Sequence, residues 1–346
     1  MRLVCAVAVV VLIACSEPAA STAPASQSPS GGVTRTPSPS ASPTLAACHL
    51  PIWWPDANNT DIDVAQLGIP SGAVSDARVL RPSSQTAAGN SFQFYGATYF
   101  GADRGWSRLN RQLVSPDGER YTYWTTAGTS TDAVHVEDIR TGADRVVYSG
   151  STLYFPIAWT NEGIYMVDAV APRQGAFKNL YRLDPIGGSG PQLVSGADRH
   201  MYQWGWVLIA DGAAWGIDNA VSSNGDYTYS VLRLDLKTSQ VVSWFGPVND
   251  MFWPIGVDLR HRLYVSDGQQ LDRVGIPGTT IELTPPGPDA IFANQGIGSE
   301  SGFVADSTAA WLSGKGGVWR YADDGRAQEF TTASPDAIVD PAAGCL

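Results

Sequence analysis

Residues Ser115–Trp124 read Ser-Pro-Asp-Gly-Glu-Arg-Tyr-Thr-Tyr-Trp, and this stretch decides the fold. The Pro-Asp-Gly run predicts a tight turn, and the aromatic and β-branched residues that follow it are typical of a half-buried strand. The stretch therefore predicts a β-hairpin that enters near Gln112 and returns through Trp124.

The same hairpin pattern recurs along the chain. The equivalent turn positions are Asp117, Asn161, Asp211, Arg260 and Ser307, which lie 44, 50, 49 and 47 residues apart. An aromatic residue stands four positions after each of them: Tyr121, Tyr165, Trp215, Tyr264 and Trp311. A period of this length is that of one propeller blade.

Four strands per period predict an all-β fold, a closed six-bladed β-propeller without long exposed sheet edges. Residues 49–110 read as an irregular first blade, and seven blades would result if they held two. The third strands also resemble one another, because an Arg alternates with apolar residues in Tyr181–Asp184, Leu232–Asp235 and Trp319–Ala322. A pair of β-sandwiches is the competing architecture, and the fixed period argues against it.

The composition agrees with an all-β protein and limits the partners. The chain holds 12 Trp, 36 Gly and 23 Pro, and only 16% of its residues are charged. The formal net charge of −11 argues against a nucleic-acid or anionic-membrane surface, since either would require a basic patch. We expect a monomer.

The N-terminus carries a motif of its own. Arg2 precedes an apolar run over residues 3–14, which ends in Leu12-Ile13-Ala14-Cys15. This resembles the lipobox of bacterial lipoproteins. The resemblance implies that residues 1–14 are a signal peptide and that Cys15 is acylated after cleavage. The alternative is an ordinary signal peptide that happens to contain cysteines. The run is short for a transmembrane helix.

Residues 15–47 form a low-complexity tract of Ser, Pro, Ala and Thr. Such a composition buries too little apolar surface to order itself, so it predicts a disordered tether. The expected organisation is a signal peptide at 1–14, a lipid-anchored linker at 15–47 and a propeller domain at 48–346. We expect the domain to face the extracytoplasmic side of the cell membrane.

Three cysteines remain once the signal peptide is removed: Cys15, Cys48 and Cys345. With Cys15 acylated, Cys48 and Cys345 are left as a pair that flanks the predicted domain, and in an oxidising compartment they would form a disulfide. Such a bond would hold the closed ring shut. Two free buried thiols are the alternative.

The repeated hairpin with its Ser-Pro-Asp-Gly turn resembles the blades of TolB-like and WD-type propellers. With the lipobox and the tether, the chain resembles an uncharacterised group of propeller lipoproteins of the bacterial surface. Only Ser115–Gly118 is a close motif match. The resemblance implies a fold and an extracytoplasmic location, and it implies no catalytic residue.

Catalytic motifs are missing from the sequence. The Asp-box of sialidase-type propellers is not met at Ser115–Gly118, and Gly298–Gly302 has Glu300 where a nucleophile elbow needs Ser. The four histidines have no metal-ligand spacing, so no metal and no cofactor are expected. A loop rich in Asp and Asn would offer oxygens to Ca²⁺, although such loops are more often plain turns; its residues are Asp56, Asn58, Asn59, Asp61 and Asp63.

A candidate site lies where the chain enters each innermost strand. In a propeller these entry loops converge on the mouth of the central channel, and the candidate residues are Asn110, Tyr154, Trp204, Trp253 and Glu300. A ring of aromatic and polar side chains would suit a sugar or peptide. The alternative is that these aromatic residues pack between blades.

Two functions from different classes follow. The first is a non-catalytic module that binds an envelope protein, a peptide or a glycan, in sensing or scaffolding. The second is an extracytoplasmic hydrolase or lyase that acts on glycans or peptides, with Glu300, Asp211 and Asp258 as the first carboxylates to test. Glycosidic chemistry needs two carboxyl groups about 5–10 Å apart across a pocket, whereas carboxylates at hairpin tips favour binding or structure.

Overall fold

The computed structural model describes residues 46–56, 60–81, 96–101, 105–126, 132–170, 176–195, 201–267, 271–283, 302–332 and 334–346. Residues Met1–Thr44 belong to a separate unit, and the fold below is that of the second unit, Leu45–Leu346. Among the described residues, no helix has the length and apolar character needed to cross a membrane.

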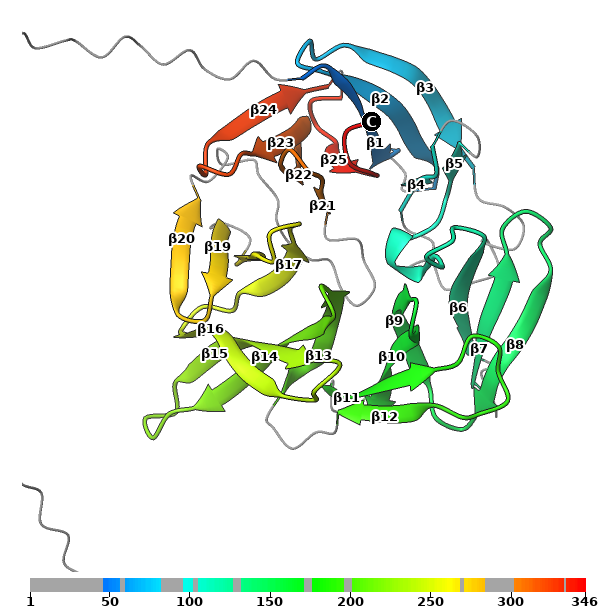
Figure 1. The fold of residues 1–346 in the computed structure, drawn as a ribbon, viewed down its shortest axis with the longest axis vertical. Coiled ribbons are helices and arrows are strands. Elements are labelled where there is room, and N and C mark those ends of the chain that lie inside the picture. The colour runs from blue at the N-terminus through cyan, green and yellow to red at the C-terminus, as the bar shows by residue number, and fades with distance from the viewer. Residues whose placement is uncertain are drawn as a thin grey trace, which may run out of the picture. The chain divides into compact units, whose positions relative to one another are not determined.

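The described residues form six antiparallel blades around a common axis (Figure 1), which confirms the predicted all-β propeller. Three consecutive blades are regular sheets of four strands. One consists of β9 (Tyr154–Thr160), β10 (Gly163–Val170), β11 (Ala176–Leu183) and β12 (Gln192–Ser195). The next consists of β13 (Met201–Ala210), β14 (Ala213–Val221), β15 (Tyr227–Asp235) and β16 (Val241–Val248). The third consists of β17 (Trp253–Val257), β18 (Leu263–Ser266), β19 (Leu271–Ile276) and β20 (Thr279–Leu283).

The second blade carries the Ser-Pro-Asp-Gly turn. Its regular strands are β6 (Arg120–Thr126), β7 (Asp132–Asp138) and β8 (Asp144–Gly150). A single bridge from Val114 to Tyr121 supplies its innermost position, directly after the 3-10 turn η2 (Arg111–Leu113). The Ser115 hydroxyl donates to Asp117 Oδ1 over 2.5 Å, and the Glu119 amide donates to the same oxygen over 3.0 Å. This pattern of side-chain bonds explains why the sequence signal for this hairpin is strong.

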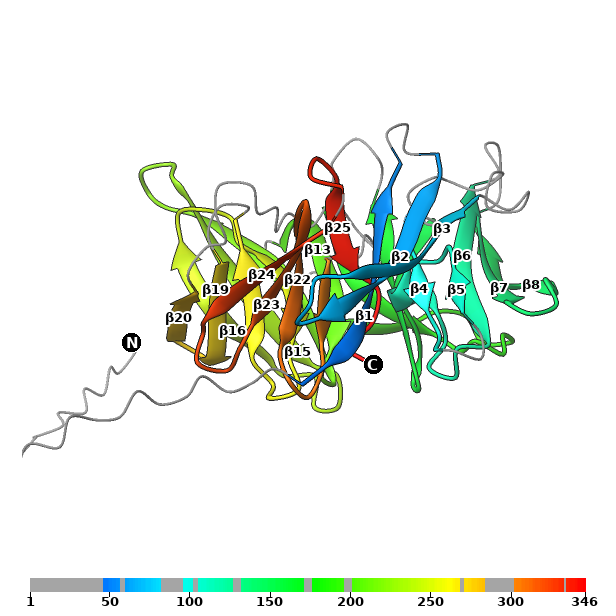
Figure 2. The same ribbon diagram turned by 90° about the horizontal axis from the view of Figure 1, so that it is seen from above.

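The first and last blades share one eight-stranded sheet. The last blade holds β21 (Phe303–Ala305), β22 (Ala310–Lys315), β23 (Gly317–Tyr321) and β24 (Ala327–Thr331). The first blade holds β1 (Cys48–Pro55), β2 (Ile62–Ile69), β3 (Val74–Leu80) and, from the other end of the chain, β25 (Ile338–Pro341). The strand β25 lies between β1 and β22 and pairs with both (Figures 1 and 2).

This arrangement corrects the prediction that residues 49–110 form the first blade by themselves. The apolar segment around Trp53 and Trp54 is strand β1, and the innermost strand comes from the C-terminus. Within residues 49–110, β4 (Thr98–Tyr99) and β5 (Trp106–Ser107) form a separate two-stranded sheet.

A disulfide joins Cys48 and Cys345, whose Cα atoms are 5.6 Å apart. Beside it, the His49 amide donates to the Leu346 carbonyl over 3.1 Å, and the Leu346 amide donates to the His49 carbonyl over 2.9 Å. The two ends of the unit therefore meet through β25, this backbone pair and a covalent bond.

Candidate functional site

One cross-strand pair recurs in four blades. The repeated aromatic residue on the second strand stands directly opposite an Arg on the third: Tyr165 and Arg182, Trp215 and Arg233, Tyr264 and Arg273, and Trp311 and Arg320. The Trp rings carry a guanidinium at 5.8 Å (Arg233) and 5.9 Å (Arg320) from their centroids. The aromatic side chains are buried, so this pair is a packing element of the repeat.

The second blade departs from this pattern. Its aromatic residue is Tyr121, and the residue opposite is Glu137 rather than an Arg. The Tyr121 hydroxyl donates to Glu137 Oε2 over 2.7 Å, and both residues are buried. Burial raises the pKa of Glu137; the Tyr121 and His135 side chains lower it in part, and Asp144 raises it further. A break in a structural repeat that buries a carboxyl group marks this blade as a candidate site.

The titratable network continues across the same blade. His135 stacks on Tyr123 with ring centroids 4.6 Å apart, and its Nδ1 lies 2.9 Å from Asp144 Oδ2. Its Nε2 lies 3.0 Å from Thr125 Oγ1. Because a carboxylate only accepts hydrogen bonds, Asp144 selects the tautomer with the proton on Nδ1, and Nε2 of the neutral ring then accepts from Thr125. The network orients His135 within the blade.

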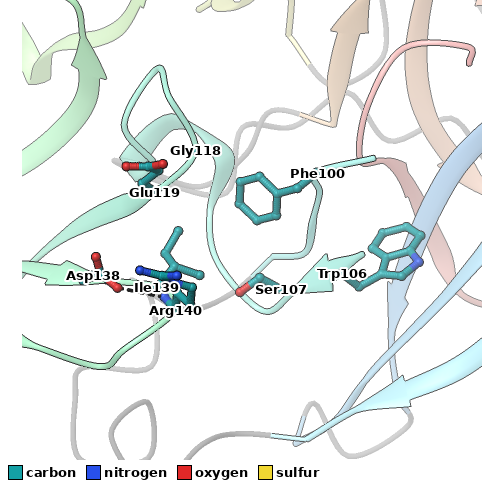
Figure 3. Close-up of a pocket in the computed structure, with 8 residues that line it drawn as sticks. All are labelled: Phe100, Trp106, Ser107, Gly118, Glu119, Asp138, Ile139 and Arg140. Carbon is teal, nitrogen blue, oxygen red and sulfur yellow. Dashed lines mark hydrogen bonds between the residues drawn. The ribbon is translucent and has the colours of Figure 1, made fainter. Parts of the chain in front are cut away.

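Two adjoining cavities lie against this blade. The first has a volume of about 670 Å³ and lies between the β4–β5 hairpin and the turns of the second blade (Figure 3); its lining residues are Phe100, Trp106, Ser107, Gly118, Glu119, Asp138, Ile139 and Arg140. The second, of about 520 Å³, extends toward β3 and is also lined by Leu80, Arg81, Arg108, Tyr121 and Glu137. Trp106, Ser107, Ile139 and Arg140 line both. Their size is that of small-ligand sites.

Figure 3 shows how the first cavity is arranged. The Phe100 ring and the Trp106 ring come from one side, and Glu119, Asp138 and Arg140 come from the other. The Asp138 carboxylate forms hydrogen bonds within its own turn, where Oδ1 accepts from the amides of Arg140 and Thr141 over 3.1 and 2.7 Å. The Thr141 hydroxyl also donates to Oδ1 over 2.8 Å, and this bond, followed by the one from the Thr141 amide, is the main reason why the pKa of Asp138 is lowered. The cavity therefore combines aromatic surface with charged groups of both signs.

Three of the five residues predicted at the channel mouth are described, and they are packed. Asn110 is buried and accepts from the Gln112 amide over 2.9 Å. Tyr154 makes edge contacts with Tyr148 and Tyr181, at centroid distances of 5.1 and 4.9 Å, and burial raises its pKa to about 12. Trp253 packs against two hydrophobic clusters. Among the described residues, no hydrogen bond or ring contact joins these three side chains to one another.

The other two residues of the predicted ring are Trp204 and Glu300. Trp204 lies in β13, but its side chain is outside the described part of the chain, and Glu300 is outside it altogether. A binding role for this ring therefore stays a prediction.

The predicted catalytic carboxylates Asp211 and Asp258 lie at hairpin turns. Asp211 Oδ1 is 2.6 Å from His261 Nδ1, which links the tips of two neighbouring blades. Asp258 is buried, and its Oδ1 accepts from the amides of Arg260 and Arg262 while Oδ2 accepts from Arg262 Nε over 2.7 Å. These bonds give both residues a structural role in their turns. Neither residue lines the two cavities described above.

The acidic loop after β1 is a local turn where it is described. Asp56 Oδ1 accepts from the amides of Thr60 and Asp61 over 2.7 and 3.1 Å. Asn58 and Asn59 lie outside the described residues. In the described part of the chain, no group of three or more His, Cys, Asp or Glu side chains is placed to hold a metal ion.

Sequence reasoning missed the residues that line the cavities, above all Glu137, Trp106 and Arg140. One signal was available for Glu137, because the third strands carry an Arg at the equivalent position in four other blades. No local pattern indicated Trp106, because Ile139 and Arg140, which line both cavities with it, come from the second blade.

The sequence matches no family model and no curated protein. Solved structures resemble it in fold. They include an oligogalacturonate lyase in complex with manganese (TM-score 0.45, 11% identity, 63% of this chain and 64% of the other). They also include the tricorn protease (TM-score 0.42, 16% identity, 82% of this chain and 26% of the other). A third is the acylaminoacyl peptidase of Pyrococcus horikoshii (TM-score 0.43, 11% identity, 78% of this chain and 44% of the other). The aligned part is thus less than two thirds of each of these proteins. At these identities the likeness is one of β-propeller fold.

Proposed function

We propose that this protein is a lipid-anchored propeller of the cell envelope that binds a small ligand beside its second blade, in sensing or scaffolding. One observation carries the proposal. The second blade buries a carboxyl group at the position where four other blades hold an Arg, and the two adjoining cavities lie against this blade.

The lining favours a ligand with both an apolar face and hydrogen-bonding groups. Trp106 and Phe100 offer ring surface, while Glu119 and Arg140 offer polar groups around it. Stacking surface beside polar groups suits a glycan fragment or a peptide side chain.

The test is a binding screen with the full-length protein in detergent, using short glycans and peptides. Trp106→Ala is expected to weaken the best ligand at least about tenfold, because Trp106 lines both cavities. Tyr227→Ala is the matched control, since Tyr227 is an exposed aromatic residue of β15 in another blade. Equal affinity of the two variants, with circular dichroism unchanged, would remove the cavities from the binding site.

The anchor and the location are part of the same proposal. Acylation of Cys15, followed by the tether at 15–47, would hold the propeller on the extracytoplasmic side of the membrane. Metabolic labelling with a palmitate analogue tests this. We expect the label on the wild-type protein and its loss in Cys15→Ser, with the variant released from the membrane fraction. Label that persists in Cys15→Ser would contradict the proposal.

A second candidate function, a hydrolase or lyase acting on glycans or peptides, rests on Glu137. A buried carboxyl group with a raised pKa at a cavity wall is suited to general acid chemistry, and Glu119 lines the adjoining cavity. Glu137→Gln separates the two functions. An enzyme would lose turnover by about 10²–10⁴-fold while keeping ligand binding, whereas a binding module shows no turnover in either form.

A further inference from the structure

The second cavity has an unusual charge balance. Among the described residues of its lining are three arginines, Arg81, Arg108 and Arg140, and one carboxyl group, that of Glu137. The whole chain carries a formal net charge of −11, so a cavity with an excess of cationic groups is opposite in sign to the molecule that holds it.

Glu137, the one carboxyl group among the described lining residues, is poorly suited to neutralise the arginines. Glu137 is 6% exposed and already accepts a hydrogen bond from Tyr121. Burial also raises its pKa, which favours the neutral form.

Two of the arginines form no ion pair within the described part of the chain, although the charge of Arg140 acts on Asp138 and helps to lower the pKa of that carboxyl group. Arg81 and Arg140 are exposed, and within the described residues neither guanidinium has an ion-pair partner within 4 Å. Several arginines in other described parts of the molecule are ion-paired, as Arg120 is with Asp117, Arg262 with Asp258 and Arg326 with Asp324. Arg108 is positioned at the cavity by its Nη1, which donates to the Thr60 carbonyl over 2.5 Å.

We propose that the second cavity binds the carboxylate group of its ligand through Arg81 and Arg140. A guanidinium presents its N–H groups in a planar fork that matches the two oxygens of a carboxylate. Because Trp106 lines both cavities, its ring would contact the part of the ligand that does not carry the carboxylate. This inference rests on the proposed function, and it adds the chemical class of the ligand: a small molecule or fragment that carries a carboxylate.

The experiment compares pairs of probes in which one member carries a carboxylate and the other a neutral group at the same position. The methyl glycoside of glucuronic acid, with its carboxylate free, is compared with methyl glucoside, and N-acetylglycine with its amide, by ligand-observed NMR titration of the full-length protein. We expect the carboxylate to bind at least about tenfold more tightly than its neutral counterpart in the pair that fits the cavity. The sugar and amino-acid pairs distinguish the two sources of carboxylate.

The variants separate recognition of the carboxylate charge from binding of the rest of the probe. Arg81→Gln and Arg140→Gln are each expected to weaken the carboxylate probe about tenfold and to leave the neutral probe unchanged. Trp106→Ala is expected to weaken both probes. Arg326→Gln is the control, because Arg326 is an exposed arginine of the last blade, bonded to Asp324.

The outcomes are distinguishable. Equal binding of charged and neutral probes, or carboxylate binding unchanged in Arg81→Gln and Arg140→Gln, overturns the inference and leaves the proposed function standing. If no probe of either charge binds and Trp106→Ala changes nothing in the broader screen, both are overturned.

Discussion

Glu137 stands opposite Tyr121 across the β6–β7 pair, with the Tyr121 hydroxyl 2.7 Å from its carboxylate. In four other blades this position holds an Arg opposite an aromatic ring. The second blade thus holds a buried carboxyl group that lines a cavity, at the position where the four other blades hold the Arg of a packing pair. This difference distinguishes the second blade from those four.

Removing the Tyr121 hydroxyl should destabilise the fold. Tyr121→Phe leaves the buried Glu137 carboxyl without this donor, which costs about 1–3 kcal/mol in the free energy of unfolding. Tyr227→Phe, at an exposed tyrosine, is the control and should change it by less than about 0.5 kcal/mol. Urea denaturation measures both. Equal stabilities of the two variants would mean that the Tyr121–Glu137 bond contributes nothing net.

Asp340 should make the fold less stable as pH rises. It lies on β25, where burial raises its pKa to about 7 while a hydrogen bond from Ser313 opposes the shift. A carboxyl group whose pKa is higher folded than unfolded binds more protons in the folded state. Its contribution is therefore fully present below about pH 4 and is lost as pH rises through about 7.

The measurement is the free energy of unfolding of the wild type and Asp340→Asn at several pH values between 4 and 8. The wild type should lose stability relative to the variant by about 2–4 kcal/mol over this range, since each pKa unit corresponds to about 1.4 kcal/mol. Parallel curves would show that Asp340 titrates normally in the folded protein.

The aromatic–Arg pair should contribute to stability where the guanidinium lies near two aromatic rings. The Arg233 guanidinium lies 5.8 Å from the Trp215 ring centroid and 5.4 Å from that of Trp244. Arg233→Gln should cost about 1–2 kcal/mol, because both ring contacts and the ion pair with Asp235 are lost. Arg326→Gln, which removes an exposed ion pair, should cost at most about 1 kcal/mol. Thermal unfolding of the two variants tests the ranking, and the reverse order would contradict it.

The Cys48–Cys345 bond should stabilise the closed ring. It spans 297 residues, and a cross-link over so long a loop is expected to contribute about 2–5 kcal/mol. The reductant-treated wild type should unfold at a lower temperature, close to that of the double variant Cys48→Ser/Cys345→Ser. The double variant should be insensitive to reductant. No effect of reductant on a wild type shown to be reduced would mean that β25 alone closes the ring.

The sequence by itself determined the repeating unit. Turn chemistry and strand alternation are local, so the period, the buried aromatic residue after each turn and the all-β fold could be predicted from residues close together in the chain. The same holds for the Ser115–Asp117 turn, whose hydrogen bonds join neighbours. The boundaries of the regular blades followed because each strand pairs with the next one along the chain.

The tertiary structure alone decided how the ring closes and where the cavities lie. Strand β25 completes a blade formed almost 300 residues earlier, and no periodic signal connects Ile338–Pro341 with Cys48–Pro55. Likewise Arg81, Trp106 and Glu137 meet only because the β4–β5 hairpin lies between the first and second blades. Contacts between segments distant in sequence depend on packing around the common axis, and a local pattern of residue types carries no information about that packing.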